Sequence, residues 1–319
     1  MAGLVVLICL LMAGPAAVTW TDPPVSLSRV DLAYPDLPPG LDGYTILLLA
    51  DLHSHRFGDG QAELLQLLDD ERWDVAVLAG DYVIERGTRD AAAFVPAAEL
   101  VRGLCARAPC YFVLGNYEGS GTYSFYPTPG SPAVTELEAA GARPIYPAVR
   151  LDRGGDHLWL SDWSRRPYAT GGSTWPEWGA FPAGMNEDTD FVVAVTHRPL
   201  DLENQTRVTT DAALLPPDGD WRAVDQISWD LNLSGHTHGG QWRLPIIGPL
   251  LSNTERGRLP LNLLPMHGDR YLWGSTAEEE GDRLRYQVIT CGVAESGPWP
   301  LRFRLFSHRE VMLVTLHRG

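Results

Sequence analysis

Lysine is missing from this 319-residue chain, so all 25 fixed positive side chains are arginines. The chain therefore has no P-loop lysine to bind nucleotide phosphates and no lysine to form a Schiff base with pyridoxal phosphate. Cysteine is scarce, with four residues and no C-x-x-C pair, which argues against a zinc knuckle or a thioredoxin-like site. The motif H-E-x-x-H is also absent, which argues against a zinc protease.

Positive charge is outnumbered by negative charge. The 25 arginines face 40 aspartates and glutamates, which gives a formal net charge of −15. Such a surface repels the phosphate backbones of nucleic acids, so we expect no nucleic-acid partner. An anionic substrate would need a local positive centre, and bound metal ions could provide it.

The N-terminal segment is apolar and has no charged side chain from residue 1 to 18. It is close to the shortest length that spans a membrane, and it has neither a basic start nor a clean cleavage site. We expect residues 1–20 to be an export signal or an uncleaved anchor, residues 21–43 a Pro-rich linker with the first strand, and residues 44–319 one catalytic domain. This organisation predicts a membrane-associated or exported protein, with a membrane surface as a possible partner.

Short apolar runs of strand length recur along the chain, and most end abruptly in polar residues. Near-continuous apolarity is typical of strands buried on both faces of a sheet. Segments with helical spacing follow the first two long runs, so the element order predicts an α/β core. The expected strands are 25–32, 45–50, 75–79, 111–114, 191–195, 229–233, 285–290, 301–305 and 311–316, the expected helices 60–71 and 90–107, and the expected long active-site loops 117–132 and 165–190.

Five polar motifs follow predicted strands, where α/β enzymes gather their sites. A lone Asp there is often a cap or a turn residue, and a lone His is usually structural. Two histidines among three glycines are different, because glycine weakens a strand and is costly as a structural device. The motifs are Asp51-Leu52-His53, Gly80-Asp81, Gly115-Asn116-Tyr117-Glu118, Thr196-His197 and Gly235-His236-Thr237-His238-Gly239-Gly240-Gln241.

Together these motifs supply seven oxygen or nitrogen donors for metal ions. Asp51 and His53 are two residues apart, so on an extended chain both side chains would point the same way and could share a cation with Asp81. Asp81 is also the candidate carboxylate to bridge two cations. The mixed donors suit two divalent ions such as Mn, Fe or Zn, which activate water and neutralise phosphate charge. The predicted ligands are Asp51, His53, Asp81, Asn116, His197, His236 and His238.

The motif order D-x-H, G-D, G-N-x-[DE], H and G-H-x-H resembles that of the calcineurin-like metallophosphoesterases. The form G-H-T-H-G-G-Q and the later Pro300-Leu301-Arg302-Phe303 resemble their membrane-associated bacterial branch, some members of which hydrolyse UDP-diacylglucosamine. The resemblance covers nearly all of the chain after residue 25.

The resemblance implies a four-layer α/β/β/α sandwich with two central mixed sheets. It also implies that a metal-bridging hydroxide cleaves a phosphomonoester, phosphodiester or pyrophosphate, of a small-molecule, nucleotide-sugar or lipid-linked substrate. By this resemblance the first metal is held by Asp51, His53, Asp81 and His238, and the second by Asp81, Asn116, His197 and His236.

One position departs from the family pattern, which usually has G-N-H-[DE] where this chain has Tyr117. That His is thought to assist the leaving group, and a phenol with a pKa near ~10 is poorly matched to this task. Activity is then lower, or the leaving group is good, or another residue such as His55 substitutes. The predicted catalytic residues are Tyr117, Glu118 and His55. The alternative function is a catalytically weak metal-binding scaffold.

The remaining polar and aromatic residues carry weaker expectations. Gln241 and Arg198 could line the site or serve local structure, and Trp175 and Trp178 are expected in the core rather than in a lipid or sugar pocket. A local disulfide between Cys105 and Cys110 is possible but not required. The histidines that match no motif are expected to be structural: His157, His267, His308 and His317.

Overall fold

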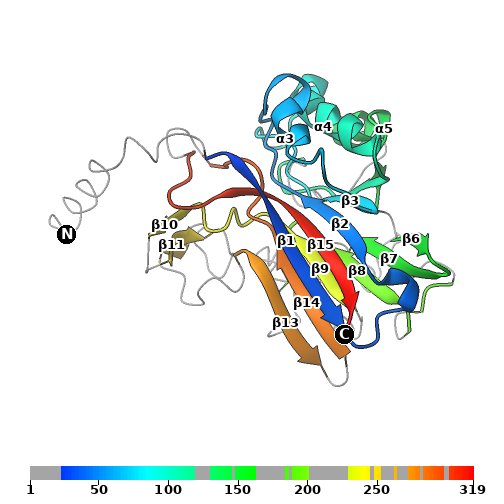
Figure 1. Ribbon diagram of the computed structural model, residues 1–319. Helices are drawn as coiled ribbons and strands as arrows, with labels where there is room; N and C mark the ends of the chain where they lie inside the picture. Colours follow the sequence, from blue (N-terminus) through cyan, green and yellow to red (C-terminus); the bar gives the residue numbers. More distant parts are fainter. Residues whose placement is uncertain are drawn as a thin grey trace, which may run out of the picture.

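The computed structural model describes residues 23–118, 130–145, 148–162, 184–186, 189–200, 229–244, 248–252, 262–263, 272–280, 283–297 and 302–319. Within these residues two six-stranded sheets form the centre of the fold (Figure 1). In sheet order, the first consists of β1 (Val25–Tyr34), β15 (Arg309–Arg318), β2 (Tyr44–Leu49), β3 (Val75–Leu78), β4 (Cys110–Phe112) and β5 (Arg143–Pro144). The second consists of β13 (Gly274–Glu280), β14 (Arg283–Ile289), β9 (Leu231–Ser234), β8 (Phe191–Val195), β7 (Asp156–Asp162) and β6 (Ala148–Arg153).

Both sheets are mixed. In the first, β2, β3, β4 and β5 are parallel to one another, while β15 runs antiparallel to β2 and parallel to β1. In the second, β7, β8, β9 and β14 are parallel, and β6 and β13 pair antiparallel at the two edges. The expected α/β class with two central mixed sheets is confirmed. A small antiparallel sheet adds β10 (Trp242–Leu244), β11 (Gly248–Ser252) and β12 (Asn262–Leu263).

The two largest layers of the hydrophobic core among the described residues lie one on each face of the first sheet, and a smaller cluster contains Val192 and Ala194 of β8. Side chains alternate along a strand, so Leu47 and Leu49 of β2 face the helices while Ile46 and Leu48 face the second sheet. All four are buried, as the near-continuous apolarity of this segment predicted. The inner layer joins the two sheets, which keeps the loops at their ends in fixed relative positions.

The α-helices among the described residues cover the outer face of the first sheet (Figure 1). They are α3 (Ala62–Gln66), α4 (Val95–Cys105) and α5 (Pro132–Ala139). The expected helix 90–107 is present as η3 (Ala91–Phe94) followed by α4, and the Asp90 side chain caps its start by accepting a hydrogen bond from the Ala92 amide at 3.0 Å. The expected helix 60–71 is shorter than predicted, because Gly60 and Gln61 have left-handed backbones and the chain turns after α3. Short 3-10 turns also occur at η1 (Pro39–Leu41) and η2 (Asp59–Gln61).

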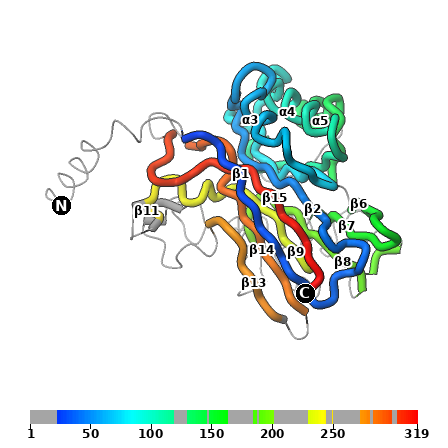
Figure 2. Tube along the Cα trace, in the orientation of Figure 1, coloured from blue at the N-terminus to red at the C-terminus, as the bar shows by residue number. Residues whose placement is uncertain are grey.

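The first strand is paired in the main sheet rather than left in a linker. β1 runs parallel to β15, with Val25 opposite Arg309 and Tyr34 opposite Arg318, so the blue and red tubes lie side by side in Figure 2. Strand 301–305 was predicted, but the described part of it, residues 302–305, does not form a strand. Only Leu305 forms a bridge, to Trp242, because the neighbouring Arg304 turns inward to bond backbone carbonyls.

Several expectations lie outside the described residues. These are the N-terminal signal or anchor 1–20, His267, Trp175 and Trp178, and most of the two expected long loops. Searched over the described residues alone, the structure has no helix of sufficient length and apolarity to span a bilayer. Cys105, Cys110 and Cys291 are free thiols, so the possible disulfide between Cys105 and Cys110 is not formed.

Candidate metal centre

Loops that follow five strands of the two sheets meet at one edge of the fold. Asp51 comes two residues after β2, Asp81 three after β3, and Asn116 four after β4. From the second sheet, His197 and His236 each come two residues after a strand end. Backbone hydrogen bonds tie the loops together, since the Asp51 amide donates to Gly80 at 3.0 Å and the Gly235 amide donates to His197 at 3.1 Å.

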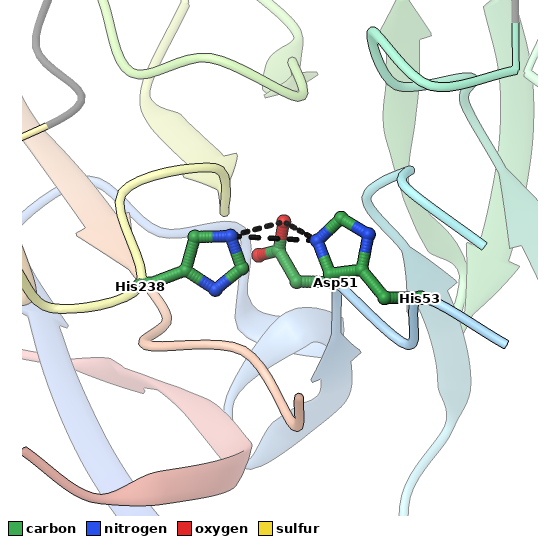
Figure 3. A group of neighbouring side chains, drawn as sticks. All are labelled: Asp51, His53 and His238. Carbon is green, nitrogen blue, oxygen red and sulfur yellow. Dashed lines mark hydrogen bonds and ion pairs between the residues drawn. The ribbon is translucent and has the colours of Figure 1, made fainter. Parts of the chain in front are cut away.

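The first cluster consists of Asp51, His53 and His238, whose donor atoms lie close enough to share an ion. In Figure 3 the Asp51 carboxylate lies between the two imidazole rings. Its Oδ1 atom is 3.8 Å from Nε2 of His53 and 3.7 Å from Nε2 of His238, and the two Nε2 atoms are 3.4 Å apart. Asp51 and His53 were expected to point the same way because the backbone between them is extended. Their side chains do lie together, but the backbone is not extended. Both residues have positive φ, and the chain coils to bring their side chains together.

The second cluster consists of Asp81, His197 and His236, with Asn116 beside it. Nε2 of His197 lies 3.1 Å from Oδ2 of Asp81, 3.0 Å from Oδ1 of Asn116 and 3.2 Å from Nδ1 of His236. The same Oδ2 atom of Asp81 is 3.9 Å from Nε2 of His53 in the first cluster. Asp81 therefore lies between the two clusters, as a bridging carboxylate would.

Backbone carbonyls orient three of the imidazole rings. Nδ1 of His53 donates to Val83 at 3.1 Å, Nδ1 of His197 donates to Ala79 at 2.7 Å, and Nδ1 of His238 donates to Ala294 at 3.0 Å. Because a carbonyl oxygen only accepts, the proton of the neutral ring is on Nδ1 and Nε2 presents a lone pair. The Nε2 lone pairs of His53 and His238 thus face each other, an arrangement that a cation between them would stabilise.

Strained backbone is concentrated at these residues. Five of the seven expected ligands have a left-handed backbone, with φ of 59° at Asp51, 46° at His53, 58° at Asp81, 71° at His236 and 51° at His238. Each such residue costs of order 1–3 kcal/mol and persists only where the surroundings enforce it. Gly115 makes one close approach possible, because a Cβ there would lie 2.1 Å from Oδ1 of Asp81. The strain indicates that side-chain placement, not backbone preference, determines the loop shapes.

The electrostatics of the buried cluster are unbalanced without a cation. Burial raises the pKa of Asp51 to about 7, and the nearby Asp81 carboxylate adds to this. Burial opposes a charge on His197, but Asp81 outweighs it and raises the pKa of His197 to about 9. Burial also lowers the pKa of His236 and His238 well below the usual value, so both are neutral. In the described structure, Oδ1 of Asp51 and Nε2 of His236 are buried without a hydrogen-bond partner. Carboxylates and imidazoles with unpartnered buried atoms are a donor set that fits divalent cations.

Comparison of the sequence with protein families identifies the family of this chain. Residues 44–240 match the calcineurin-like phosphoesterases, a range that covers more than half of the chain and all seven residues of the two clusters. The chain belongs to the calcineurin-like phosphoesterase family. No curated protein matches the sequence.

Three solved structures have chains with a weak likeness to this one. A purple acid phosphatase from yellow lupin (Lupinus luteus) is 11% identical, with a TM-score of 0.35, over 88% of this chain and 55% of that chain. The chain thus spans about half the length of that phosphatase. An archaeal phosphodiesterase is 13% identical, with a TM-score of 0.28, over 76% of this chain and 99% of its own. GAP50, the anchor in the inner membrane complex of Plasmodium, is 14% identical, with a TM-score of 0.35, over 81% of this chain and 75% of its own.

Glu118 was expected to be catalytic, and in this calcineurin-like phosphoesterase its carboxylate binds backbone amides. Its two carboxylate oxygens accept hydrogen bonds from the backbone amides of Asp81 at 3.0 Å, Tyr82 at 2.6 Å, Val83 at 3.3 Å and Gly115 at 2.6 Å. Backbone amides thus engage both oxygens of Glu118. It is a positioning residue that holds the Asp81 loop against the loop after β4.

Tyr117 lies beside the first cluster. Its ring packs edge-on against His53, with centroids 4.8 Å apart, and its amide donates to Oδ1 of Asp81 at 2.9 Å. Burial raises the pKa of Tyr117, and the Asp81 carboxylate adds to the effect, so the phenol stays protonated. The His55 ring instead packs against Phe57, with centroids 4.5 Å apart.

Arg304 and Gln241 support the centre through hydrogen bonds with the backbone. Arg304 is buried and donates to the carbonyls of His238 at 3.2 Å and Ala294 at 2.8 Å, the second of which also accepts from the His238 ring. Gln241, which was left open between the site and local structure, exchanges two hydrogen bonds with the backbone of Ser296, at 3.0 and 3.1 Å. The contacts of Arg304 with His238 and of Gln241 with Ser296 each join residues more than 50 positions apart, so local sequence carries no signal of them.

Proposed function

We propose that the two clusters hold a pair of divalent cations and that this protein is a metal-dependent phosphoester hydrolase. One observation supports this most strongly: Asp81 lies between two buried histidine clusters, 3.1 Å from His197 and 3.9 Å from His53. Asp51, His53, Asp81 and His238 would hold one cation, and Asp81, Asn116, His197 and His236 the other. A pair of such cations lowers the pKa of bound water and neutralises charge on phosphate oxygens.

The chain's own residues contribute order and charge. The carbonyls of Val83, Ala79 and Ala294 hold three imidazoles as Nδ1–H tautomers, which directs Nε2 to the centre. Arginines lie near the same place in a protein of net charge −15. Burial is the largest cause of the lowered pKa of His236, and the positive charge of Arg198 is the second largest. The positive charge of Arg302 likewise contributes to the lowered pKa of His53. These guanidinium groups favour an anionic substrate.

We further propose that the substrate is a nucleotide-sugar or lipid-linked pyrophosphate, acted on by a membrane-associated or exported enzyme. The G-H-T-H-G-G-Q motif, residues 300–303 and the apolar segment 1–20 support the membrane-associated bacterial branch. Tyr117 supports a substrate with a good leaving group, because a protonated phenol with a raised pKa is a weak general acid at neutral pH.

A substrate panel tests this function. The purified full-length protein, reconstituted with Mn²⁺ or Zn²⁺, should hydrolyse nucleotide-sugar pyrophosphates faster than alkyl phosphodiesters, and chelator should abolish the activity. Failure to hydrolyse any phosphoester, with metal bound, would support the alternative of a catalytically weak metal-binding scaffold. Cleavage of aryl phosphodiesters without any pyrophosphate would contradict the proposed substrate and leave the hydrolase intact.

The variant Tyr117→His should restore general-acid assistance. We expect the rate with a poor leaving group, such as an alkyl phosphodiester, to rise about 100-fold, the lower end of the usual range for a general acid. With an aryl leaving group the rate should change little, because protonation is not needed. Steady-state kcat on both substrates measures the difference. Tyr117→Phe is the control, and it should match the wild type on both; an equal gain on both substrates would show that the new His acts in another way.

A further inference from the structure

A third group of metal-binding side chains lies outside the two clusters, between the end of β14 and the start of β15. Cys291 comes two residues after β14, while His308 and Glu310 lie on either side of the first residue of β15. Their donor atoms, one sulfur, one nitrogen and one oxygen, all lie within 4.8 Å of one another. No sequence motif marks this group, and His308 was expected to be merely structural.

We propose that Cys291, His308 and Glu310 form a further metal site, which binds one zinc-class cation through a thiolate, an imidazole and a carboxylate. Nε2 of His308 lies 3.7 Å from Sγ of Cys291 and 3.2 Å from Oε2 of Glu310. Donor atoms held about 2.0–2.3 Å from one tetrahedral zinc ion are separated by about 3.3–3.7 Å. The separations of His308 from Cys291 and from Glu310 are close to those of ligands on a single ion, and all three donor atoms lie within 4.8 Å of one another.

The charge of this group also suits a divalent ion. Cys291 and Glu310 are buried, and a thiolate with a carboxylate would balance the two positive charges of a zinc-class cation.

Neighbouring groups orient the ligands and leave one side open. The Ser28 hydroxyl donates to Oε2 of Glu310 at 2.5 Å, and the Cys291 amide donates to its Oε1 at 2.7 Å. The Trp273 ring packs edge-on against His308, with centroids 5.1 Å apart. The His308 side chain is 40% exposed, which gives an ion a path in and leaves a position for water as the fourth ligand.

The position of this site suggests what the ion does. Cys291 lies directly behind the histidine loop, since a Cβ on Gly239 would be 2.6 Å from its sulfur, and Gly239 follows His238. Arg304 joins the same parts, because it donates to the carbonyl of Cys291 at 2.7 Å and to that of His238 at 3.2 Å. A cation on Cys291 would therefore brace the loop that carries His238 from its rear side.

Cobalt substitution of the full-length protein tests the site. Co²⁺ bound to a thiolate gives a near-ultraviolet charge-transfer band, whereas Co²⁺ on nitrogen and oxygen ligands does not. We expect the band in the wild type and its loss in Cys291→Ser. Cys105→Ser is the matched control, because Cys105 is a free thiol distant in sequence from the site, and this variant should keep the band. Asp81→Asn should keep the band too, because Asp81 is not part of this third group. The outcome of this test is therefore independent of the proposed hydrolase function.

A metal count gives a second measurement in case Cys291→Ser fails to fold. His308→Ala changes a partly exposed side chain and should lower the bound metal from about three equivalents to about two. A wild type that binds about two equivalents and shows no charge-transfer band would overturn the proposal. So would a band that survives Cys291→Ser, a band lost in Cys105→Ser, or an unchanged metal count in His308→Ala.

Discussion

Replacing Asp81 with Asn is expected to lower phosphoester hydrolysis at least about 10³-fold, since it removes several kcal/mol of metal-dependent stabilisation. The physical reason is the position of the Asp81 carboxylate, whose Oδ2 is 3.1 Å from Nε2 of His197 and 3.9 Å from Nε2 of His53. An amide is neutral and presents only one oxygen, so it bridges two cations poorly. Elemental analysis should show less bound metal, and kcat on the best pyrophosphate substrate should fall with it.

Asp152→Asn is the matched control, because Asp152 is an exposed carboxylate that pairs with Arg150 at the surface. It should keep wild-type activity and metal content. Asp81→Asn with full activity and two bound metals would contradict the bridging role. Loss of activity in both variants would point instead to a general effect on the charge of the protein.

Replacing Arg304 with Met is expected to lower the free energy of unfolding by about 3–5 kcal/mol, because several buried carbonyls lose a donor at a cost of about 1–3 kcal/mol each, while Glu295 keeps its ion pair with Arg309. Arg304 pairs with Glu295 at 3.1 Å and donates to the carbonyls of His238, Cys291, Gly292 and Ala294 at 2.7–3.2 Å. Met fills similar volume but donates nothing, so these carbonyls lose a partner in the interior. The shift in the urea midpoint of the full-length protein measures the loss.

Arg150→Met is the comparison for Arg304, because the Arg150 side chain is 48% exposed and pairs with a single surface carboxylate. Its effect should stay within about 0.5 kcal/mol, as for most surface changes. Equal midpoints for the two variants would mean that the Arg304 network adds nothing to stability. Arg304→Met should also weaken metal binding, because the Ala294 carbonyl that orients the His238 ring loses one of its two donors.

The sequence was most informative about strand ends. Continuous apolar runs predicted buried strands, and the polar residues after them predicted where the chain would gather its donors. The structure brings all seven expected ligand residues into one place. Their local shape was not predictable in the same way, because positive φ at Asp51, His53 and Asp81 opposes intrinsic backbone preference and is imposed by the tertiary packing.

What the sequence missed depends on contacts between distant residues. Glu118 was expected to act in catalysis, but its carboxylate binds backbone amides 35 to 37 residues away as well as the nearby Gly115 amide. The Cys291, His308 and Glu310 group depends on how β14 leads into β15, which no local pattern specifies. Helix α5 was missed because its eight residues follow a Gly- and Pro-rich stretch that resembles a loop.

The pairing of the first and last strands has a consequence for biosynthesis. β15 lies between β1 and β2, so β1 and the adjoining edge of β2 lack their partner strand until residues 309–318 leave the ribosome. Contacts across such a long stretch of chain form slowly, since loop closure must precede them. Until then the unpaired edge of β2 is a site for wrong pairing. A ribosome that stalls late would therefore release a chain prone to aggregate, even with every metal-binding motif already made.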